Sequence, residues 1–136
     1  MILPYLDASA VIYLLEGAEA ARSLVEEKIA QAEGDVNGLL LTSQLSRLEC
    51  RVKPLRLADG PLLARYDGFF SQRRVNVLDL SEQVIDLATD LRVKYGFKTP
   101  DAIHLACAIV GGADGFVTGD AALGKCSELK VEVVSP

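Results

Sequence analysis

The feature that most constrains this chain is a repeated alternation of short apolar runs and longer segments with helical periodicity. The apolar runs have the length of buried strands and cover 2–6, 38–42, 75–80, 115–118 and 131–134. Strands that alternate with helices form a parallel sheet joined by right-handed crossovers. The sequence therefore predicts an α/β fold with a central, mainly parallel sheet of about five strands, the last of them at an edge.

The segments between these runs carry apolar residues at helical spacing. Helices are expected over 9–16, 19–33, 59–73, 82–95 and 100–110, with a further helix that follows Ser43 and carries Glu49, and one short turn near 123. Several have recognisable ends: Gly17, Gly34 and Gly96 are typical terminators, and Ser43 is a suitable N-cap. In the last long helix, Thr99 is expected as the N-cap and Pro100 as the first helical residue.

The size and composition predict one domain over 1–136. The chain has 136 residues, half of them hydrophobic, which is enough for one core. No apolar run approaches the roughly 18 residues that span a bilayer, and the N-terminus has no signal-peptide pattern, so we expect a soluble, cytoplasmic protein without membrane association. A net charge of −5 argues against broad electrostatic binding to nucleic acid. Any such binding must depend on local charge or on metal ions.

The cysteines do not suggest a metal or redox centre. They are Cys50, Cys107 and Cys126, an odd number, far apart and without a C-x-x-C pair. We expect them to be reduced, with Cys50 and Cys107 buried.

Acidic residues follow two of the predicted strands. Asp7 comes after the first strand and Asp120 after the fourth. In open α/β sheets, ligands bind outside the carboxyl ends of the strands, so both positions suit chemistry. For Asp7, the alternative is a plain helix N-cap. Asp101 lies in the first turn of a helix that is otherwise apolar, where it either enters a pocket or only complements the helix dipole.

A fourth carboxylate, Glu49, lies on the helix after Ser43. The spacing places it beside an apolar stripe of Leu45, Leu48 and Val52, and so toward the core. A buried carboxylate needs a cation, a hydrogen-bond donor or a metal ion. A salt bridge to a neighbouring basic residue is the simple alternative.

The basic residues around Glu49 form the densest positive stretch of the chain: Arg47, Arg51, Lys53 and Arg56. Such a run is either a solvated face or a contact for RNA or for a protein partner. The helix over 59–73 has the most aromatic residues, which suit core packing or self-association.

Four carboxylates at one sheet edge would repel one another, so a divalent metal ion is the economical explanation. Oxygen ligands favour Mg²⁺ or Mn²⁺ over zinc. The single histidine, His104, follows Asp101 by three residues. It is interpreted as a hydrogen-bonded core residue, with metal ligation as the alternative.

Four motifs together resemble the PIN domain family, and in particular the VapC-type toxins of toxin–antitoxin pairs. They are Leu6-Asp7-Ala8-Ser9, Thr42-Ser43 through Leu48-Glu49, Pro100-Asp101-Ala102 through His104-Leu105-Ala106, and Thr118-Gly119-Asp120. The resemblance implies a three-layer α/β/α PIN-like fold and a Mg²⁺- or Mn²⁺-dependent endoribonuclease. Asp7, Glu49, Asp101 and Asp120 would be catalytic and bind the metal, and Ser9 and Thr118 would support them.

The resemblance further implies an RNA substrate, a cognate antitoxin and a homodimer. In the family, cleavage leaves 5′-phosphate and 3′-hydroxyl ends. One departure is Leu123, where many members have an aromatic residue.

Two other functions compete with this interpretation. A phospho-receiver domain would use Asp79 as phosphoacceptor, but receivers have an adjacent acidic pair after the first strand, whereas Asp7 is followed by Ala8-Ser9. An aspartate-nucleophile phosphohydrolase fails for a similar reason, because Ser9 stands where a second Asp is needed. A non-catalytic PIN-like module that only binds nucleic acid or protein is the other alternative, and the four acids weigh against it.

Overall fold

A computed structural model of the chain describes residues 3–33 and 38–134. The elements follow one another as β1 (Pro4–Leu6), α1 (Ala8–Glu16), α2 (Glu19–Glu33), β2 (Leu40–Ser43), α3 (Gln44–Arg56), α4 (Gly60–Phe70), β3 (Val75–Leu78), α5 (Glu82–Tyr95), α6 (Thr99–Val110), β4 (Gly115–Thr118), the 3₁₀ helix η1 (Ala121–Lys125) and β5 (Val131–Val133). The predicted alternation of strands and helices is confirmed. The expected terminator Gly34 lies outside the described residues.

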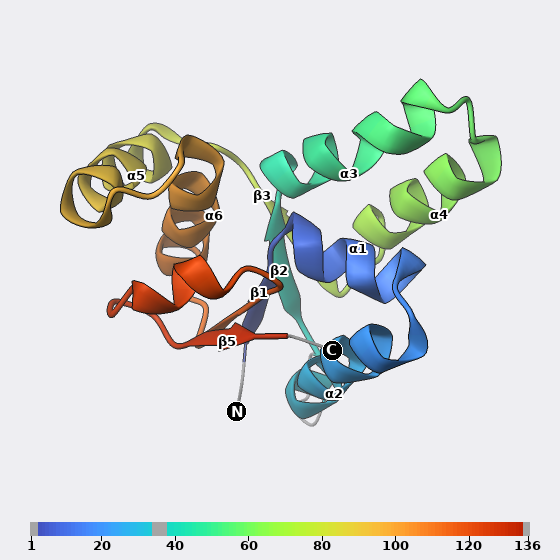
Figure 1. The fold of residues 1–136 in the computed structure, drawn as a ribbon, viewed down its shortest axis with the longest axis horizontal. Coiled ribbons are helices and arrows are strands. Elements are labelled where there is room, and N and C mark those ends of the chain that lie inside the picture. The colour runs from blue at the N-terminus through green and yellow to red at the C-terminus, as the bar shows by residue number, and fades with distance from the viewer. Residues whose placement is uncertain (1–2, 34–37, 135–136) are drawn as a thin grey trace.

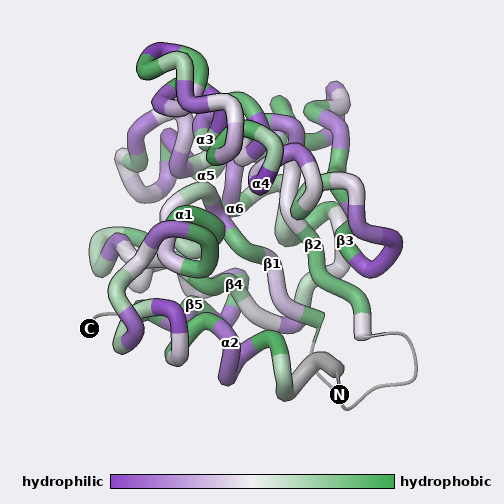
Figure 2. Tube along the Cα trace, turned by 90° about the vertical axis from the view of Figure 1, so that its right-hand side faces the viewer, coloured by the Kyte–Doolittle hydropathy of each residue, from purple (hydrophilic) through white to green (hydrophobic). Residues whose placement is uncertain are grey.

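The five strands form one sheet in the order β3-β2-β1-β4-β5, and every neighbouring pair is parallel. The strands lie in that order across Figure 2. β1 is the central strand and is buried along its whole length. Its position brings the residue that follows it, Asp7, to the middle of the carboxyl edge of the sheet.

Helices cover both faces of the sheet and enclose two cores (Figure 1). Because side chains alternate along a strand, Leu6, Leu40 and Val117 face one core with α1, α2 and α4. Tyr5, Leu41 and Phe116 face the other, with α5 and α6. The predicted three-layer α/β/α arrangement is therefore confirmed.

The sheet order excludes the phospho-receiver alternative. Receiver domains have the strand order 2-1-3-4-5, whereas here β3 is an edge strand next to β2. Asp79, which follows β3, is exposed at that edge rather than at the centre of the sheet.

The N-terminus of α6 differs from the prediction by one residue. The helix includes Thr99, and Lys98 occupies the N-cap position without a side-chain capping bond. The expected Thr99 cap is therefore wrong, because Thr99 already has helical geometry. By contrast, Ser43 caps α3 as predicted, accepting a hydrogen bond from the Ser46 amide at 3.4 Å.

The face that α3 buries also differs from the prediction. The buried residues are the small Ser46, Cys50 and Pro54, which allow α3 to pack closely. Leu48 is 60% exposed and Val52 is 41% exposed. The predicted apolar stripe of Leu45, Leu48 and Val52 thus lies mostly on the surface. Glu49 lies at the boundary between the buried and the exposed face of α3.

The aromatic residues of α4 belong to the core. Tyr66, Phe69 and Phe70 are all buried, which confirms core packing as their use. Any contact of this helix with a second copy would have to use its exposed side. The three cysteines are free and buried, as expected for Cys50 and Cys107.

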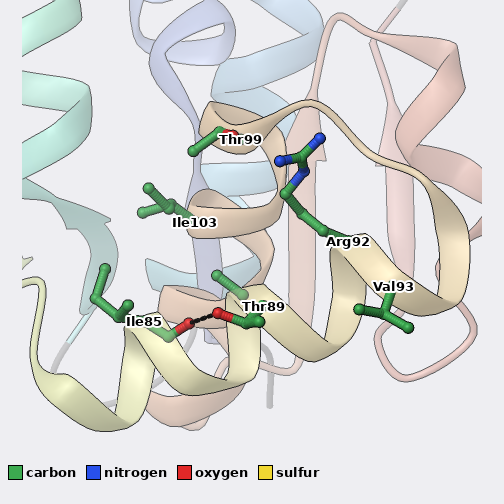
Figure 3. Close-up of a pocket in the computed structure, with 7 residues that line it drawn as sticks. Ile85, Thr89, Arg92, Val93, Thr99 and Ile103 are labelled. Carbon is green, nitrogen blue, oxygen red and sulfur yellow. Dashed lines mark hydrogen bonds between the residues drawn. The ribbon is translucent and has the colours of Figure 1, made fainter.

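Exposed apolar side chains gather instead on α3 and α5. Leu48, Val52 and Leu55 are exposed on α3, and Ile85 and Val93 on α5. Ile85 and Val93 also line a groove of about 450 Å³ between α5 and α6 (Figure 3). None of the helices within 3–33 and 38–134 has both the length and the apolar character needed to cross a membrane.

Candidate active site

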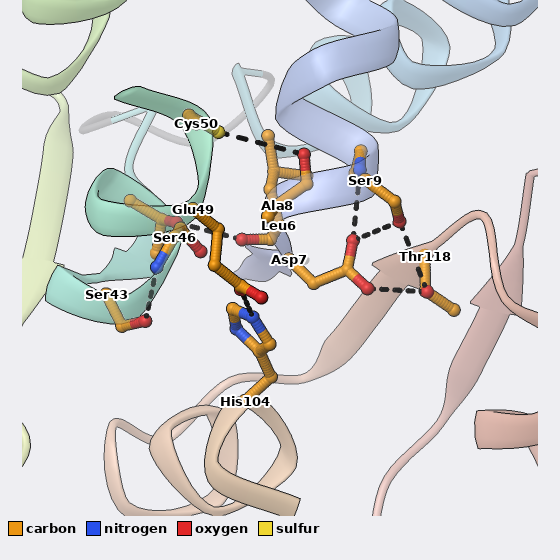
Figure 4. Close-up of polar contacts among 12 residues, drawn as sticks. Leu6, Asp7, Ala8, Ser9, Ser43, Ser46, Glu49, Cys50, His104 and Thr118 are labelled. Carbon is orange, nitrogen blue, oxygen red and sulfur yellow. Dashed lines mark hydrogen bonds and ion pairs between the residues drawn. The ribbon is translucent and has the colours of Figure 1, made fainter. Parts of the chain in front are cut away.

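Asp7 stands at the centre of the candidate site and is only 6% exposed. It caps α1: one carboxylate oxygen accepts from the Ala10 amide at 3.0 Å and from Ser9 Oγ at 2.6 Å. The other oxygen accepts from Thr118 Oγ1 at 2.6 Å (Figure 4). Asp7 is therefore the N-cap of α1, and a role in chemistry stays a prediction. Carboxylate oxygens accept more than one bond each, so the second oxygen keeps capacity for a further partner.

Ser9 and Thr118, the two predicted supporting residues, both contact Asp7 directly. Each hydroxyl also accepts a backbone amide: Ser9 Oγ accepts from Gly119 at 2.9 Å, and Thr118 Oγ1 accepts from Asp120 at 3.0 Å. These bonds connect the end of β1 to the end of β4. They fix the Asp7 carboxylate relative to the backbone that carries Asp120.

Asp120 and Asp101 are the other two aspartates of the candidate site. Asp120 follows β4 and caps η1, where its carboxylate accepts from the Ala122 amide at 2.9 Å. Asp101 is partly buried in the first turn of α6. Burial raises the pKa of Asp101, and the negative charges of Asp120 and Asp7 raise it further, whereas His104 and Lys98 act in the opposite direction. These effects on Asp101 require Asp120 and Asp7 to lie in its neighbourhood.

Glu49 approaches the same region from α3. Its carboxylate is 2.6 Å from Nε2 of His104, and no basic neighbour on α3 pairs with it in the described part of the chain. Glu49 and Asp7 also act together on Cys50: burial raises the pKa of this thiol to about 12, with both carboxylates contributing. A thiol with such a pKa is not a nucleophile near neutral pH.

The contact between Glu49 and His104 could not be found by sequence reasoning. His104 is buried, as expected of a core histidine, and its second nitrogen, Nδ1, lies 2.8 Å from the Tyr5 hydroxyl. Tyr5 and His104 are 99 positions apart, and His104 and Glu49 are 55 apart. The only signal in the sequence was a polar ring within an otherwise apolar helix.

Two residues of the predicted basic cluster form ion pairs within the fold, and two do not. Arg51 pairs with Asp67 at 2.9 Å, and Lys53 pairs with Glu16 at 2.7 Å. Neither Arg47 nor Arg56 forms an ion pair within the ranges that the structure describes. Arg47 and Arg56 are therefore the members of the cluster with charge to offer another molecule.

The acids have the right chemistry for a divalent cation, but not the spacing of a closed site. Among residues 3–33 and 38–134, no three acidic, histidine or cysteine side chains stand close enough to hold a metal ion. In the same ranges, Asp7, Asp101 and Asp120 form no ion pair with a basic side chain. Carboxylates without a counter-charge supply the type of oxygen ligand that Mg²⁺ or Mn²⁺ prefers. Leu123 is buried beneath η1 and is not available to line this site.

Comparisons with known proteins agree with this fold. The family model described as the PIN domain matches residues 5–129. The fold is similar to that of VapBC2 from Rickettsia felis, solved bound to a promoter DNA fragment, with a TM-score of 0.76, 16% identity and coverage of 97% of this chain and 98% of that one.

Two further solved structures are similar. A toxin–antitoxin complex from Klebsiella pneumoniae has a TM-score of 0.73 and 19% identity, with 96% of each chain covered. VapC20 from Mycobacterium tuberculosis, described as a sarcin–ricin-loop-cleaving toxin, has a TM-score of 0.69 and 15% identity, with 93% of this chain and 98% of that one covered. No curated protein matches the sequence.

Proposed function

Because the chain belongs to the PIN domain family, we propose that it is a Mg²⁺- or Mn²⁺-dependent endoribonuclease and the toxin of a toxin–antitoxin pair. One observation carries the proposal: Asp101 is close enough to Asp120 and Asp7 for their negative charges to add to the effect of burial in raising its pKa, and none of the three acids forms an ion pair with a basic side chain in the described ranges. An arrangement that costs folding energy is expected where it serves a function.

In this proposal Asp7, Glu49, Asp101 and Asp120 hold the metal ions. When bound, the metal supplies an activated water and stabilises negative charge on the attacking and leaving oxygens of a phosphodiester. The protein contributes the positions of the ligands. Ser9 and Thr118 orient the Asp7 carboxylate through bonds of 2.6 Å, and the backbone bond from Asp120 to Thr118 keeps the third acid beside it.

The assay that tests the proposal is cleavage of a labelled RNA with Mn²⁺, with excess chelator, and with the Asp7→Asn and Asp101→Asn variants. We expect cleavage to require the metal and to be lost in both variants, because the carboxylates alone cannot supply an electrophile. Cleavage that persists in chelator, or at wild-type rates in both variants, would refute the nuclease. A folded protein that binds RNA without cleaving it under any metal condition would favour the binding-module alternative.

We infer a cognate antitoxin as the protein partner. The support is that similar structures include a toxin–antitoxin complex from Klebsiella pneumoniae and VapBC2 from Rickettsia felis. A small open reading frame beside the gene would encode this partner. Its product should form a stable complex with the chain on co-expression and suppress RNA cleavage, and a purified complex that cleaves RNA as fast as the free chain would contradict this role.

Arg47 and Arg56 are the basic residues that we propose for contact with RNA or the antitoxin, because Arg51 and Lys53 already pair within the fold. If each arginine neutralises one RNA phosphate, its replacement by Ala should reduce the salt dependence of RNA binding by about 0.7 in log–log slope. The matched control is Arg51→Ala with Lys53→Ala, which should leave the slope nearly unchanged. Equal slopes in both double variants would remove Arg47 and Arg56 from the RNA interface.

We also propose a homodimer that uses the exposed apolar side chains of α3 and α5. Val93 is 84% exposed and Leu55 is 57% exposed. Removing such apolar side chains from water is the main favourable contribution to the free energy of protein association. Val93→Glu combined with Leu55→Glu should shift the protein from dimer to monomer in light scattering. Val133→Glu, on the edge strand β5, is the control and should remain dimeric. A monomeric wild type at micromolar concentration would contradict the dimer.

A further inference from the structure

We propose that His104 is a positioning residue: it fixes the orientation of the Glu49 carboxylate, and Tyr5 in turn fixes the orientation of the His104 ring. The inference rests on the proposed function, since it assigns a role within the same site. His104 makes no contact with the reacting phosphodiester in this role and acts only through Glu49.

The contact geometry is a chain of hydrogen bonds that runs from Tyr5 on the central strand through His104 to Glu49. Figure 4 shows its last link, between His104 and Glu49. On β1, the Tyr5 hydroxyl oxygen lies 2.8 Å from Ser43 Oγ and 2.8 Å from Nδ1 of His104, and its single proton can be donated to either neighbour. On the opposite side of the ring, Nε2 lies 2.6 Å from the Glu49 carboxylate. Both ring nitrogens are therefore engaged, and the ring has one orientation.

The base of this chain is rigid. Tyr5 is fully buried, and its ring is stacked on Phe116 with centroids 5.2 Å apart and planes 12° from parallel. Burial raises the pKa of Tyr5 well above its ordinary value, so the phenol keeps its proton. Because the Tyr5 ring is buried and its hydroxyl is fixed, the contact with Nδ1 can fix the position of the His104 ring.

The far end of the chain would be mobile without His104. Glu49 is on α3 next to the exposed Leu48, and its side chain is 34% exposed, whereas that of His104 is 4% exposed. A glutamate on a half-exposed helix face has many rotamers. The bond to His104 selects one of them.

The bond also fixes where one proton lies. An ionised carboxylate can only accept hydrogen bonds, so Nε2 must carry the proton that it donates to Glu49. A ring with a bare Nε2 would place two acceptors 2.6 Å apart. The contact therefore predicts that Nε2, the nitrogen that faces Glu49, carries a proton.

Two variants separate positioning from mere packing. His104→Gln keeps an N–H donor at about the reach of Nε2, whereas His104→Asn is too short to reach Glu49. We expect His104→Asn to lower Mn²⁺ affinity and RNA cleavage by about 10- to 100-fold, the usual cost of losing the partner of a metal ligand, and His104→Gln to retain most of both. Equal values for the two variants would overturn the proposal.

A double-variant cycle tests whether His104 acts through Glu49. In a Glu49→Gln background, His104→Asn should cause little additional loss of Mn²⁺ affinity, because the group that it positions is already altered. Full additivity of the two losses would contradict the proposal.

Tyr5→Phe keeps the ring and removes only the hydroxyl, so it provides a milder variant should His104→Asn fail to fold. It should lower Mn²⁺ affinity in the same direction by a smaller factor, and an unchanged affinity would contradict the proposal.

The histidine can be observed directly because the chain contains only one. In the metal-free protein, ¹⁵N NMR of the ring should show a protonated Nε2 whose signal changes in Glu49→Gln. A bare Nε2, or a signal indifferent to Glu49, would overturn the contact. This measurement stays informative if the wild type neither binds Mn²⁺ nor cleaves RNA, which would refute the proposed function alone. A His104→Asn variant that matches an active wild type would refute the positioning role alone.

Discussion

The two sides of the acidic edge differ in how fully their carboxylates are satisfied. On one side, Asp7 is buried and accepts from Ser9, Ala10 and Thr118. On the other, Asp101 has its pKa raised by burial and by its acidic neighbours, and Asp120 caps only a short 3₁₀ turn. Asp7 is thus held by hydrogen bonds of the fold itself, whereas the ionised form of Asp101 is disfavoured by its surroundings.

This difference indicates which acid serves which purpose. Asp7 is both a structural cap and a site residue, so its replacement should damage stability and activity together. Asp101 contributes little to the fold and opposes it electrostatically at neutral pH. Replacing Asp101 should therefore separate the two properties, with activity lost and stability gained.

The largest effect is expected from Asp7→Ala. The variant removes a helix cap and leaves two hydroxyls and one amide without their acceptor, which should cost about 2–3 kcal/mol of unfolding free energy and abolish RNA cleavage. Asp59→Ala is the control, because Asp59 also caps a helix, accepting from the Leu62 amide at 3.1 Å, but away from the site. It should cost about 1 kcal/mol in denaturant melts with cleavage intact. Equal losses of stability would remove the distinction that we draw.

A smaller effect is expected from Thr118→Val, which preserves shape and removes one hydroxyl. The Asp120 amide loses its acceptor and Asp7 loses a donor, so stability should fall by about 1–2 kcal/mol and cleavage by about tenfold. Thr89→Val on α5 is the matched control, since the exposed Thr89 hydroxyl only bonds the Ile85 carbonyl of its own helix. A Thr118→Val variant with wild-type cleavage would show that Asp7 needs no orientation.

The smallest effect, and one of opposite sign, is expected from Asp101→Asn in the metal-free protein. Because the pKa of Asp101 is raised in the folded state, its ionised form destabilises the fold above that pKa, and the penalty disappears as the pH falls below the unfolded value of about 3.9. The variant should thus be more stable at pH 7 by about 0.5–1 kcal/mol and equal to wild type near pH 3. Asp90→Asn, exposed on α5, should show no such difference.

Much of the fold could be predicted because it depends on local patterns. The helix over Glu19–Glu33 has the predicted bounds, and the strands stand where short apolar runs predicted them. Periodicity failed on α3, where the large apolar residues face outward and the small Ser46 and Cys50 face the core. The spacing of apolar residues predicts which residues share one face of a helix, but not which face the rest of the protein covers.

The site could be predicted only in part for a related reason. Asp7 and Asp120 follow parallel strands, so topology alone places them at one edge. The partner of Glu49 could not be predicted, because basic neighbours in sequence competed with a histidine on another helix, and only the fold brings His104 within 2.6 Å. The contributions of Ser9 and Thr118 came from family resemblance, and the structure explains them by their bonds to Asp7.

The central claim is that the acids at this edge lie together in order to hold a divalent cation. Melting curves of wild type and Asp101→Asn, each with and without Mn²⁺, test it most directly and need no knowledge of the RNA. A ligand that binds only the folded state stabilises it by about 2.7 kcal/mol at a hundredfold excess over its dissociation constant. We expect Mn²⁺ to raise the melting temperature of the wild type, and Asp101→Asn to melt higher without metal and to respond less to it. A variant that melts lower without metal and yet responds fully to Mn²⁺ would contradict the claim and leave Asp101 with a purely structural role.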